Sequence, residues 1–221
     1  MNSDYLKCRK GGSRHPDWQR LYEEEEVEKL PWYLDALDLD FEQEINAGKL
    51  KPGQLLDIGT GPGTQAEKLA RLGFKVTGID VSSAAVAMAQ KRTGAVQFLQ
   101  DNILETRLCA QFDSALDRGC FHVLSVDQRA LYVAGVSQAL KTGGLLFLKV
   151  MSTAEPERPF GPLRISKKEI KDVFESHFKI LELRESEFAG ATPYRPKALF
   201  AVLEKIPIRM HSTGPSFVPF H

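Results

Sequence analysis

Short apolar runs alternate with amphipathic stretches through the middle of the chain, between residues 54 and 151. Such runs bounded by turn residues are typical of buried strands, and apolar residues spaced three or four apart are typical of helices. The expected strands are residues 55–58, 75–80, 95–100, 112–117 and 144–150. The expected helices are a stretch that Gly73 ends, residues 82–92 and residues 127–141. Because apolar strands alternate with helices, we expect a parallel sheet covered on both faces.

The pattern changes after residue 151. Residues 152–164 contain prolines and show no clear period, so we expect a loop there. Ser166 and Glu169 have the spacing of a capping box and predict a short helix that follows. Two further strands have no helix between them, and we therefore expect them to pair antiparallel. These strands are residues 178–188 and 198–205.

The two ends of the chain differ from this middle part. Residues 16–48 look helical with a break at residues 31–33, and we expect residues 1–48 to form a cap or lid segment on a main domain of residues 49–206. Residues 207–221 are rich in turn residues and have no period, so the sequence predicts a tail without indicating its role. A chain of 221 residues therefore fits one domain with appended segments.

Charge and composition narrow the classes of function. Lys+Arg 29 equals Asp+Glu 29, so we expect neither a nucleic-acid partner nor binding to an anionic membrane surface. No apolar stretch approaches the length of a membrane span, and the first residues lack the apolar core of a signal peptide. The cysteines are too few and scattered for a disulfide framework or a zinc site, so we expect no metal and a reducing, cytoplasmic location. They are Cys8, Cys109 and Cys120.

A glycine-rich turn with an acidic residue follows the first expected strand. Asp57 precedes glycines at alternate positions, Gly59, Gly61 and Gly63, whereas dinucleotide sites use the spacing G-x-G-x-x-G. A carboxylate is poorly placed beside a pyrophosphate and well placed beside a cation. S-adenosylmethionine carries a sulfonium and an ammonium and has no phosphate. The turn therefore favours S-adenosylmethionine over NAD as the ligand.

Acidic residues also stand at the ends of the next two strands. Asp80 can accept hydrogen bonds from both ribose hydroxyls, although a carboxylate there also suits the capping of the helix that begins near Ser82. Asp101 can accept from an adenine amino group, with Ile103 covering the ring, although Asp-Asn is also an ordinary turn. In open parallel sheets ligands bind at the carboxyl ends of the strands, where these acidic residues would gather.

At this point the chain resembles the class I S-adenosylmethionine-dependent methyltransferases. The resemblance implies a doubly wound α/β fold whose mostly parallel, seven-stranded sheet ends in a reversed C-terminal hairpin, and it implies an enzyme. The motifs that carry it, in order, are DIGTGPGT, TGIDVS, LQDNI, FDSALDRGCFHVL and LKTGGLLFLKV.

A finer resemblance connects the chain to the small-molecule branch that includes thiopurine and tellurite-type methyltransferases. It implies a small substrate, such as a thiol, a chalcogen oxyanion or a heterocycle, and an N-terminal segment that closes over the cofactor. The residues that carry it are DRGCFHVL after the fourth strand, the W…Y…PWY pattern before the first strand, and GPLRIS after the fifth.

The resemblance and the strand-end argument together predict the residues of the site. Arg118, His122 and Trp18 are the candidates for substrate contact, with Arg118 alternatively a structural ion pair and His122 alternatively a packed histidine. The predicted cofactor-binding residues are Trp32, Asp57, Gly59, Thr60, Gly61, Gly63, Asp80, Val81, Asp101, Asn102, Ile103 and Asp117.

The expected reaction is transfer of a methyl group from S-adenosylmethionine to a small molecule by in-line displacement. The nucleophile is sulfur, nitrogen or a chalcogen other than sulfur. The cofactor supplies the leaving group, so the protein need only align the reactants and exclude water. We therefore assign no catalytic residue beyond the candidate His122. The alternatives are a non-catalytic scaffold that binds S-adenosylmethionine and, third, an NAD-dependent enzyme. The sequence does not indicate an oligomeric state.

The aromatic residues of the N-terminal segment predict how the site is covered. Residues 16–48 carry both tryptophans together with Tyr22 and Tyr33. We expect this segment to be mobile without ligand and ordered over the cofactor, with Trp32 near its methionine end. The alternative is a segment packed permanently on the sheet, with its tryptophans in the core.

Overall fold

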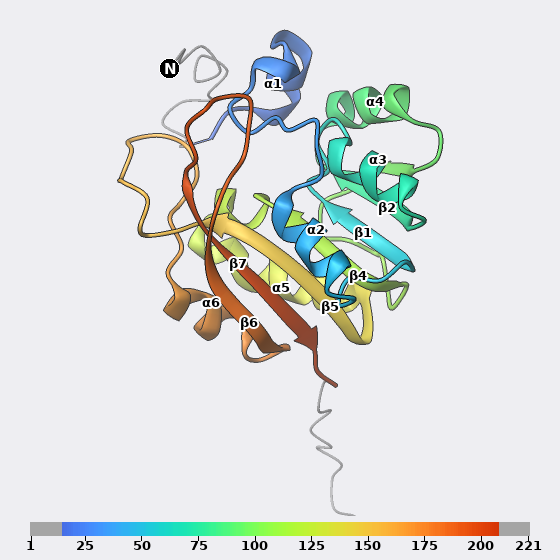
Figure 1. The fold of residues 1–221 in the computed structure, drawn as a ribbon, viewed down its shortest axis with the longest axis vertical. Coiled ribbons are helices and arrows are strands. Elements are labelled where there is room, and N and C mark those ends of the chain that lie inside the picture. The colour runs from blue at the N-terminus through green and yellow to red at the C-terminus, as the bar shows by residue number, and fades with distance from the viewer. Residues whose placement is uncertain (1–14, 208–221) are drawn as a thin grey trace, which may run out of the picture.

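The computed structural model of the chain describes residues 15–207 and consists of one seven-stranded sheet with helices on both faces (Figure 1). The strand order is β3-β2-β1-β4-β5-β7-β6. Strands β1 to β5 pair in parallel, and β7 pairs antiparallel with β5 and with β6. The predicted fold class is therefore confirmed, including the reversed C-terminal hairpin. The strands are β1 Gln54–Ile58, β2 Lys75–Asp80, β3 Gln97–Gln100, β4 Phe112–Arg118, β5 Leu140–Met151, β6 Phe178–Glu187 and β7 Lys197–Lys205.

The helices begin where local capping signals predict them. The Ser82 hydroxyl accepts a hydrogen bond from the Ala85 N–H and caps α4, and Ser166 forms the predicted capping box with Glu169 at the start of α6. The helices are α1 Trp18–Glu24, α2 Leu39–Asn46, α3 Thr64–Arg71, α4 Ser83–Arg92, α5 Arg129–Ala139 and α6 Lys167–Phe174, with short 3-10 turns η2 Val27–Lys29, η3 Phe121–Val123 and η4 Val126–Gln128.

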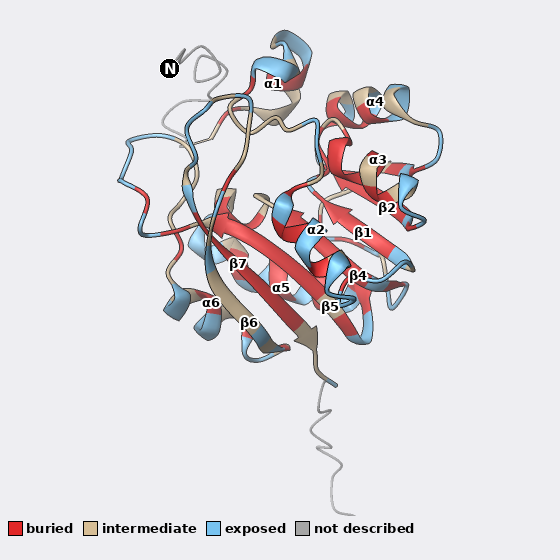
Figure 2. Cartoon of the chain, in the orientation of Figure 1, coloured by how far each residue is buried: buried red, intermediate tan, exposed pale blue. Residues whose placement is uncertain are grey.

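Two apolar clusters lie on opposite faces of the sheet and hold the layers together. On one face α2, α3 and α4 pack around Phe41, Leu69 and Phe147, and on the other α5 and α6 pack around Tyr132 and Phe174. The central strands are buried over most of their length (Figure 2). Burial on both faces explains why these strands appear in the sequence as continuous apolar runs rather than alternating ones.

The break expected at residues 31–33 within the helical region 16–48 is present, and it is longer than expected. Between η2 and α2 the chain runs without helix, and Leu30 and Asp38 both have extended backbone angles. Pro31 explains the break, because proline disfavours helical angles in the residue before it. The structure describes the predicted tail only at Pro207; residues 208–221 lie outside the described part of the chain.

The end of the helix expected over residues 127–141 also differs from the prediction. Helix α5 ends at Ala139, and β5 begins at Leu140 instead of near residue 144. The early start follows from pairing, since Leu140 lies opposite Phe112 of β4 before an irregularity in the register. Among residues 15–207, no helix combines the length and the apolar character needed to cross a bilayer.

Candidate active site at the carboxyl ends of β1, β2 and β4

The glycine-rich turn between β1 and α3 has a backbone that side chains would obstruct. Gly59 and Gly61 have φ angles of 65° and 53°, in the left-handed region that favours glycine. A Cβ on Gly61 would lie 2.9 Å from the Tyr22 hydroxyl, and one on Gly59 would lie 2.9 Å from the Cys120 Cβ. The turn thus presents bare backbone toward the N-terminal segment and the β4 end of the sheet.

Gly63 serves a different purpose from the other two glycines. A Cβ there would lie 2.9 Å from atoms of both Ala89 and Phe98. Its lack of a side chain therefore allows the start of α3 to pack closely against α4 and β3. The structure places Gly63 in this packing contact rather than on a cavity wall.

Asp57 lies at the base of the turn and is 3% exposed. Its carboxylate accepts a hydrogen bond of 2.6 Å from the Thr60 hydroxyl. Burial and, to a smaller extent, the nearby Asp117 and Asp80 carboxylates raise the pKa of Asp57 to about 7, against that hydrogen bond. Within residues 15–207, no ion pair includes Asp57 or Asp80.

Asp80, at the end of β2, joins the glycine turn to helix α4. One carboxylate oxygen accepts from the Gly61 N–H and the other from the Ser82 N–H, each at 2.9 Å. Burial raises the pKa of Asp80, although these backbone N–H groups oppose the rise. The alternative interpretation, that Asp80 supports the start of α4, is thus correct in part, but Ser82 is the capping residue. Each oxygen keeps a lone pair for a further donor.

Asp117, at the end of β4, has a structural role that its predicted cofactor contact did not anticipate. It is 0% exposed and accepts hydrogen bonds from the N–H groups of residues 119–121 and from the Tyr132 hydroxyl. Burial raises its pKa to about 6. Because both oxygens are engaged inside the protein, its side chain is not available to a ligand and instead fixes the turn after β4.

The third acidic strand end forms an ordinary turn as well. Asp101 accepts from the Asn102 N–H at 2.8 Å and from the Thr106 hydroxyl at 2.6 Å. Asn102 accepts from the Leu104 N–H. Ile103 is 4% exposed and belongs to the core cluster beneath α5, so its side chain presents no free face for a ring in this structure.

Two hollows are lined by residues that contact or follow Asp80, although Asp80 itself lines neither. The hollow beside the glycine turn has a volume of about 60 Å³, and the hollow between α1 and the start of α4 has a volume of about 370 Å³. The predicted site residues that line the first hollow are Trp32, Asp57, Gly59, Thr60, Gly61 and Arg118. The second contains Trp18 and Val81.

Two residues of α1 that the sequence analysis did not assign to the site face these hollows. Tyr22 is buried against Gly61, and burial together with Asp80 raises the pKa of its hydroxyl well above the usual value. The side-chain amide oxygen of Gln19, Oε1, accepts from the hydroxyls of Ser82 and Ser83 and from the Ala84 N–H, at 3.1–3.3 Å. The available signal was their spacing of three, which places Gln19 and Tyr22 on one helix face.

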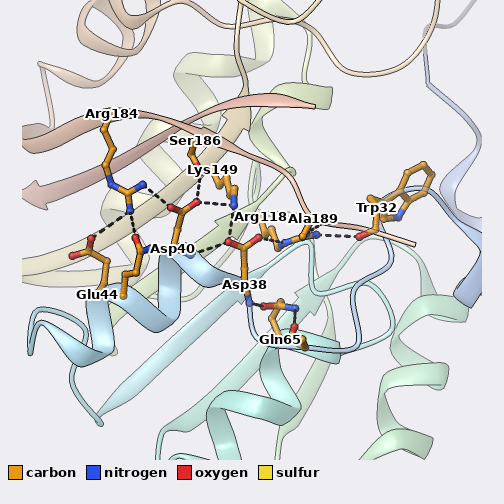
Figure 3. Close-up of polar contacts among 12 residues, drawn as sticks. Trp32, Asp38, Asp40, Glu44, Gln65, Arg118, Lys149, Arg184, Ser186 and Ala189 are labelled. Carbon is orange, nitrogen blue, oxygen red and sulfur yellow. Dashed lines mark hydrogen bonds and ion pairs between the residues drawn. The ribbon is translucent and has the colours of Figure 1, made fainter. Parts of the chain in front are cut away.

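Arg118, a predicted substrate contact, is instead held by three protein acceptors (Figure 3). Its Nε donates to Asp38 at 2.7 Å, and its terminal nitrogens donate to the carbonyls of Trp32 at 3.0 Å and Ala189 at 2.5 Å. The side chain is 9% exposed. The ion pair that the sequence analysis allowed as an alternative is thus present, while contact of Arg118 with an anionic substrate stays a prediction.

His122, the candidate base, is packed and neutral. Its Nδ1 accepts from the Met151 N–H at 2.9 Å, so the neutral ring carries its proton on Nε2. Burial and, to a smaller extent, the positive charges of His15 and Arg118 lower its pKa to about 3. A base must be able to take up a proton near the working pH. The alternative interpretation of His122 as a satisfied, buried histidine is therefore the one the structure supports.

The chain is similar to methyltransferases in sequence. Residues 55–144 match the family model described as Methyltransferase domain. An uncharacterized methyltransferase of Schizosaccharomyces pombe is 32% identical over 119 residues, which span 52% of this chain and 81% of that relative. A putative methyltransferase of Geobacillus is 30% identical over 119 residues, which span 51% of this chain and 48% of that relative.

Solved structures share the fold at lower identity. The structure of a protein that converts a disulfide bond into a thioacetal group during echinomycin biosynthesis superposes with a TM-score of 0.76 and 23% identity, over 86% of this chain and 92% of that one. The N-methyltransferase NodS of Bradyrhizobium japonicum, in complex with S-adenosyl-L-homocysteine, superposes with a TM-score of 0.66 and 21% identity, over 85% and 98%.

The chain belongs to the S-adenosylmethionine-dependent methyltransferases, and S-adenosylmethionine is its methyl donor. The glycine turn and the buried carboxylates without cationic partners fit such a donor, because they offer bare backbone and uncompensated negative charge at the same strand ends. The predictions of an enzyme and of this cofactor are confirmed. The finer resemblance to the thiopurine and tellurite-type branch stays a prediction.

Proposed function

We propose that the protein methylates a small-molecule acceptor at sulfur, at another chalcogen or at nitrogen by in-line displacement. The observation that carries the proposal is the pair of buried carboxylates, Asp57 and Asp80, next to the bare backbone of Gly59 and Gly61. When bound, S-adenosylmethionine supplies an activated methyl group and its own leaving group. The work left to the chain is to bind, orient and exclude water.

The residues that would hold the donor lie around the two hollows. Asp57 supplies negative charge for a cationic group, and Asp80 supplies free lone pairs for hydroxyl donors. Trp18 and Val81 line the larger hollow, and Trp32 lines the smaller one. The carboxylate of Asp101 and the backbone of residues 102 and 103 stay candidates for the adenine end of the donor.

The acceptor is best matched by a small uncharged molecule with a soft or aromatic nucleophile. Both cations at the ends of β4 and β5 are paired: Arg118 with Asp38, and Lys149 with Asp38 and Asp40. His122 is neutral and packs against the Phe188 ring. Among the predicted substrate contacts, no side chain is thus free to neutralise an oxyanion or to act as a base. This favours thiols and ring nitrogens over chalcogen oxyanions.

We further propose that residues 15–37 act as a lid on a catalytic domain of residues 49–206. The hollow beneath Tyr22 and Trp32 has a volume of about 60 Å³, whereas sites for molecules of drug size have roughly 300–1,000 Å³. The segment must therefore shift for the donor to enter. Leu21, Tyr22 and Leu30 pack with Ala85 in a small cluster separate from the two sheet cores, which suits a segment that moves as a unit.

The decisive experiment first titrates the purified protein with S-adenosyl-L-homocysteine and with NAD. It then compares the transfer of labelled methyl groups to thiols, to heterocycles and to chalcogen oxyanions. Binding of the homocysteine compound with methylation of uncharged thiols or heterocycles supports the proposal. Binding of NAD alone would refute the donor, and preference for oxyanions would refute the acceptor class.

A matched pair of glycine variants tests the turn. Gly61→Val should abolish binding of S-adenosyl-L-homocysteine, because a side chain there would meet Tyr22 and fill the turn. Gly48 has a similar φ of 70° and nothing within 4 Å of an added Cβ, so Gly48→Val carries the same backbone strain without touching the site. Equal binding by both variants would show that the turn does not contact the donor.

A further inference from the structure

We propose that Arg118 is a positioning residue that couples closure of the lid to the ordering of the β6–β7 loop, residues 188–196. The inference rests on the proposed function and goes beyond it, because it predicts that donor binding also sets the wall on the acceptor side. Arg118 is the last residue of β4, so its backbone belongs to the sheet while its side chain reaches both segments.

Arg118 joins the two segments through their main chains. One terminal nitrogen donates to the carbonyl of Trp32 in the lid, and the other donates to the carbonyl of Ala189 in the loop (Figure 3). A planar guanidinium has donors in a fixed fork, so a shift of either carbonyl misaligns its hydrogen bond. Both hydrogen bonds of this one rigid group therefore depend on where the lid and the loop lie.

The guanidinium of Arg118 is also fixed by Asp38, through Nε rather than through the terminal nitrogens that contact the lid and the loop. Its Nε donates to Asp38, which also accepts from the Lys149 ammonium at 2.6 Å. The Asp38 N–H donates to the Gln65 side chain, which in turn donates to the carbonyl of Ala36. Asp38 therefore marks the anchored end of the N-terminal segment, and the contacts at Trp32 lie on the part that can move.

A second, independent contact joins the lid and the loop. A Cβ built on Gly190 would lie 2.0 Å from the carbonyl oxygen of Pro31 and 3.5 Å from the Trp32 Cα. The loop backbone thus packs directly on the lid backbone, and only glycine permits the approach. In Figure 1 the β6–β7 loop and the segment after α1 run along the same edge of the molecule.

The loop begins with a residue that lies beside two of the predicted substrate contacts, Arg118 and His122. Phe188 is 8% exposed, and its ring lies 5.5 Å from the Arg118 guanidinium carbon and 5.5 Å from the His122 ring. The base of the loop is anchored separately, since Glu155 accepts from the Tyr194 hydroxyl and from the Lys197 N–H. Residues 189 and 190, directly after Phe188, are the part of the loop that is joined to the lid through Arg118 and through the Pro31 contact.

Hydrogen exchange with and without S-adenosyl-L-homocysteine tests the coupling. In the wild-type protein the compound should slow amide exchange at least about fivefold both in residues 17–37 and in residues 188–196. In Arg118→Met the lid should still respond, and the response of residues 188–196 should disappear. Gly190→Ala should give the same separation by wedging the two backbones apart, without removing a charge.

The control and the contrary outcomes are defined by the same measurement. Arg184→Met is the control, because it removes a cation of the same ionic cluster. Arg184 contacts Asp40 and Glu182 but neither the lid nor residues 189 and 190, so the lid and the loop should both still respond to the compound. A wild-type lid response without a loop response, or a loop response that survives in Gly190→Ala, overturns the coupling even if Arg118→Met does not fold. No binding of the compound to the wild type would instead refute the proposed function, on which the coupling depends.

Discussion

Buried carboxylates form two groups, one at the glycine turn and one at the start of α2, and the groups differ in whether the protein supplies cations for them. Asp57 and Asp80 at the glycine turn have hydroxyl and backbone N–H partners and raised pKa values. Asp40, at the start of α2, is similarly buried, yet its pKa is lowered because the Lys149 ammonium, Ser186 and Arg184 outweigh the effect of burial.

This difference separates a structural site from a ligand site. The cluster of Asp38, Asp40, Lys149, Arg118 and Arg184 is complete without a ligand and ties α2 to β4, β5 and β6 (Figure 3). The glycine turn holds negative charge that is unfavourable when buried alone. A cationic methyl donor would supply the missing charge, so burial without a partner is the physical mark of the binding side.

The largest expected effect comes from breaking the complete cluster. Lys149→Met leaves the buried carboxylates of Asp38 and Asp40 without their shared cation, and the free energy of unfolding should fall by about 3–5 kcal/mol. Urea denaturation measures the change. In the control Lys141→Met, the exposed pair with Asp113 is lost, and the change should stay within about 1 kcal/mol. Similar losses in both variants would contradict the structural role of the cluster.

A pH series sharpens the comparison at Asp57. Its folded-state pKa of about 7 lies above the unfolded value of about 3.9, so the neutral form is the one that folding favours. The resulting stabilisation is fully present below about pH 4 and is lost as the pH rises through about 7, by as much as roughly 4 kcal/mol. In Asp57→Asn this loss should be absent, so the wild type should lose stability relative to the variant by that amount over the same pH range.

The same variant reports on the donor. Ionised Asp57 should favour the cationic S-adenosylmethionine, so wild-type affinity should increase as the pH rises through about 7, and Asp57→Asn should remove that increase. Asp113→Asn is the control, because Asp113 is exposed and Lys141 lowers its pKa. Parallel pH profiles for wild type and Asp57→Asn, in both stability and affinity, would contradict the interpretation.

The smallest expected effect concerns Asp80. Asp80→Ala should weaken donor binding by about 2–4 kcal/mol, since hydrogen bonds to a charged group contribute about 1.5–3 kcal/mol each and water restores part of the loss. Calorimetric titration with S-adenosyl-L-homocysteine measures it, with circular dichroism to confirm the fold. Because Asp80 also holds the Gly61 N–H, Asp80→Asn, which keeps an acceptor, should lose less. Unchanged affinity in a folded Asp80→Ala protein would exclude Asp80 from the site.

Most of the fold could be predicted from the sequence because its signals are local. Strand burial on both faces leaves continuous apolar runs, and the capping box at Ser166 and Glu169 satisfies its own backbone groups within four residues. The glycine turn is also local, since φ angles above zero at Gly59 and Gly61 demand glycine whatever surrounds them. These features therefore predicted the sheet, its reversed hairpin and the donor side of the site.

Only the tertiary structure decided what the remaining candidates do. Arg118 meets Asp38 across 80 residues of sequence, and Lys149 meets Asp38 across 111, so no local pattern could distinguish a paired arginine from a free one. His122 and Asp117 follow the same rule, because their roles depend on burial and on the Met151 N–H and Tyr132 hydroxyl that the fold brings to them. Sequence alone predicted a donor side at the glycine turn, and long-range packing determined which charges near it are already paired.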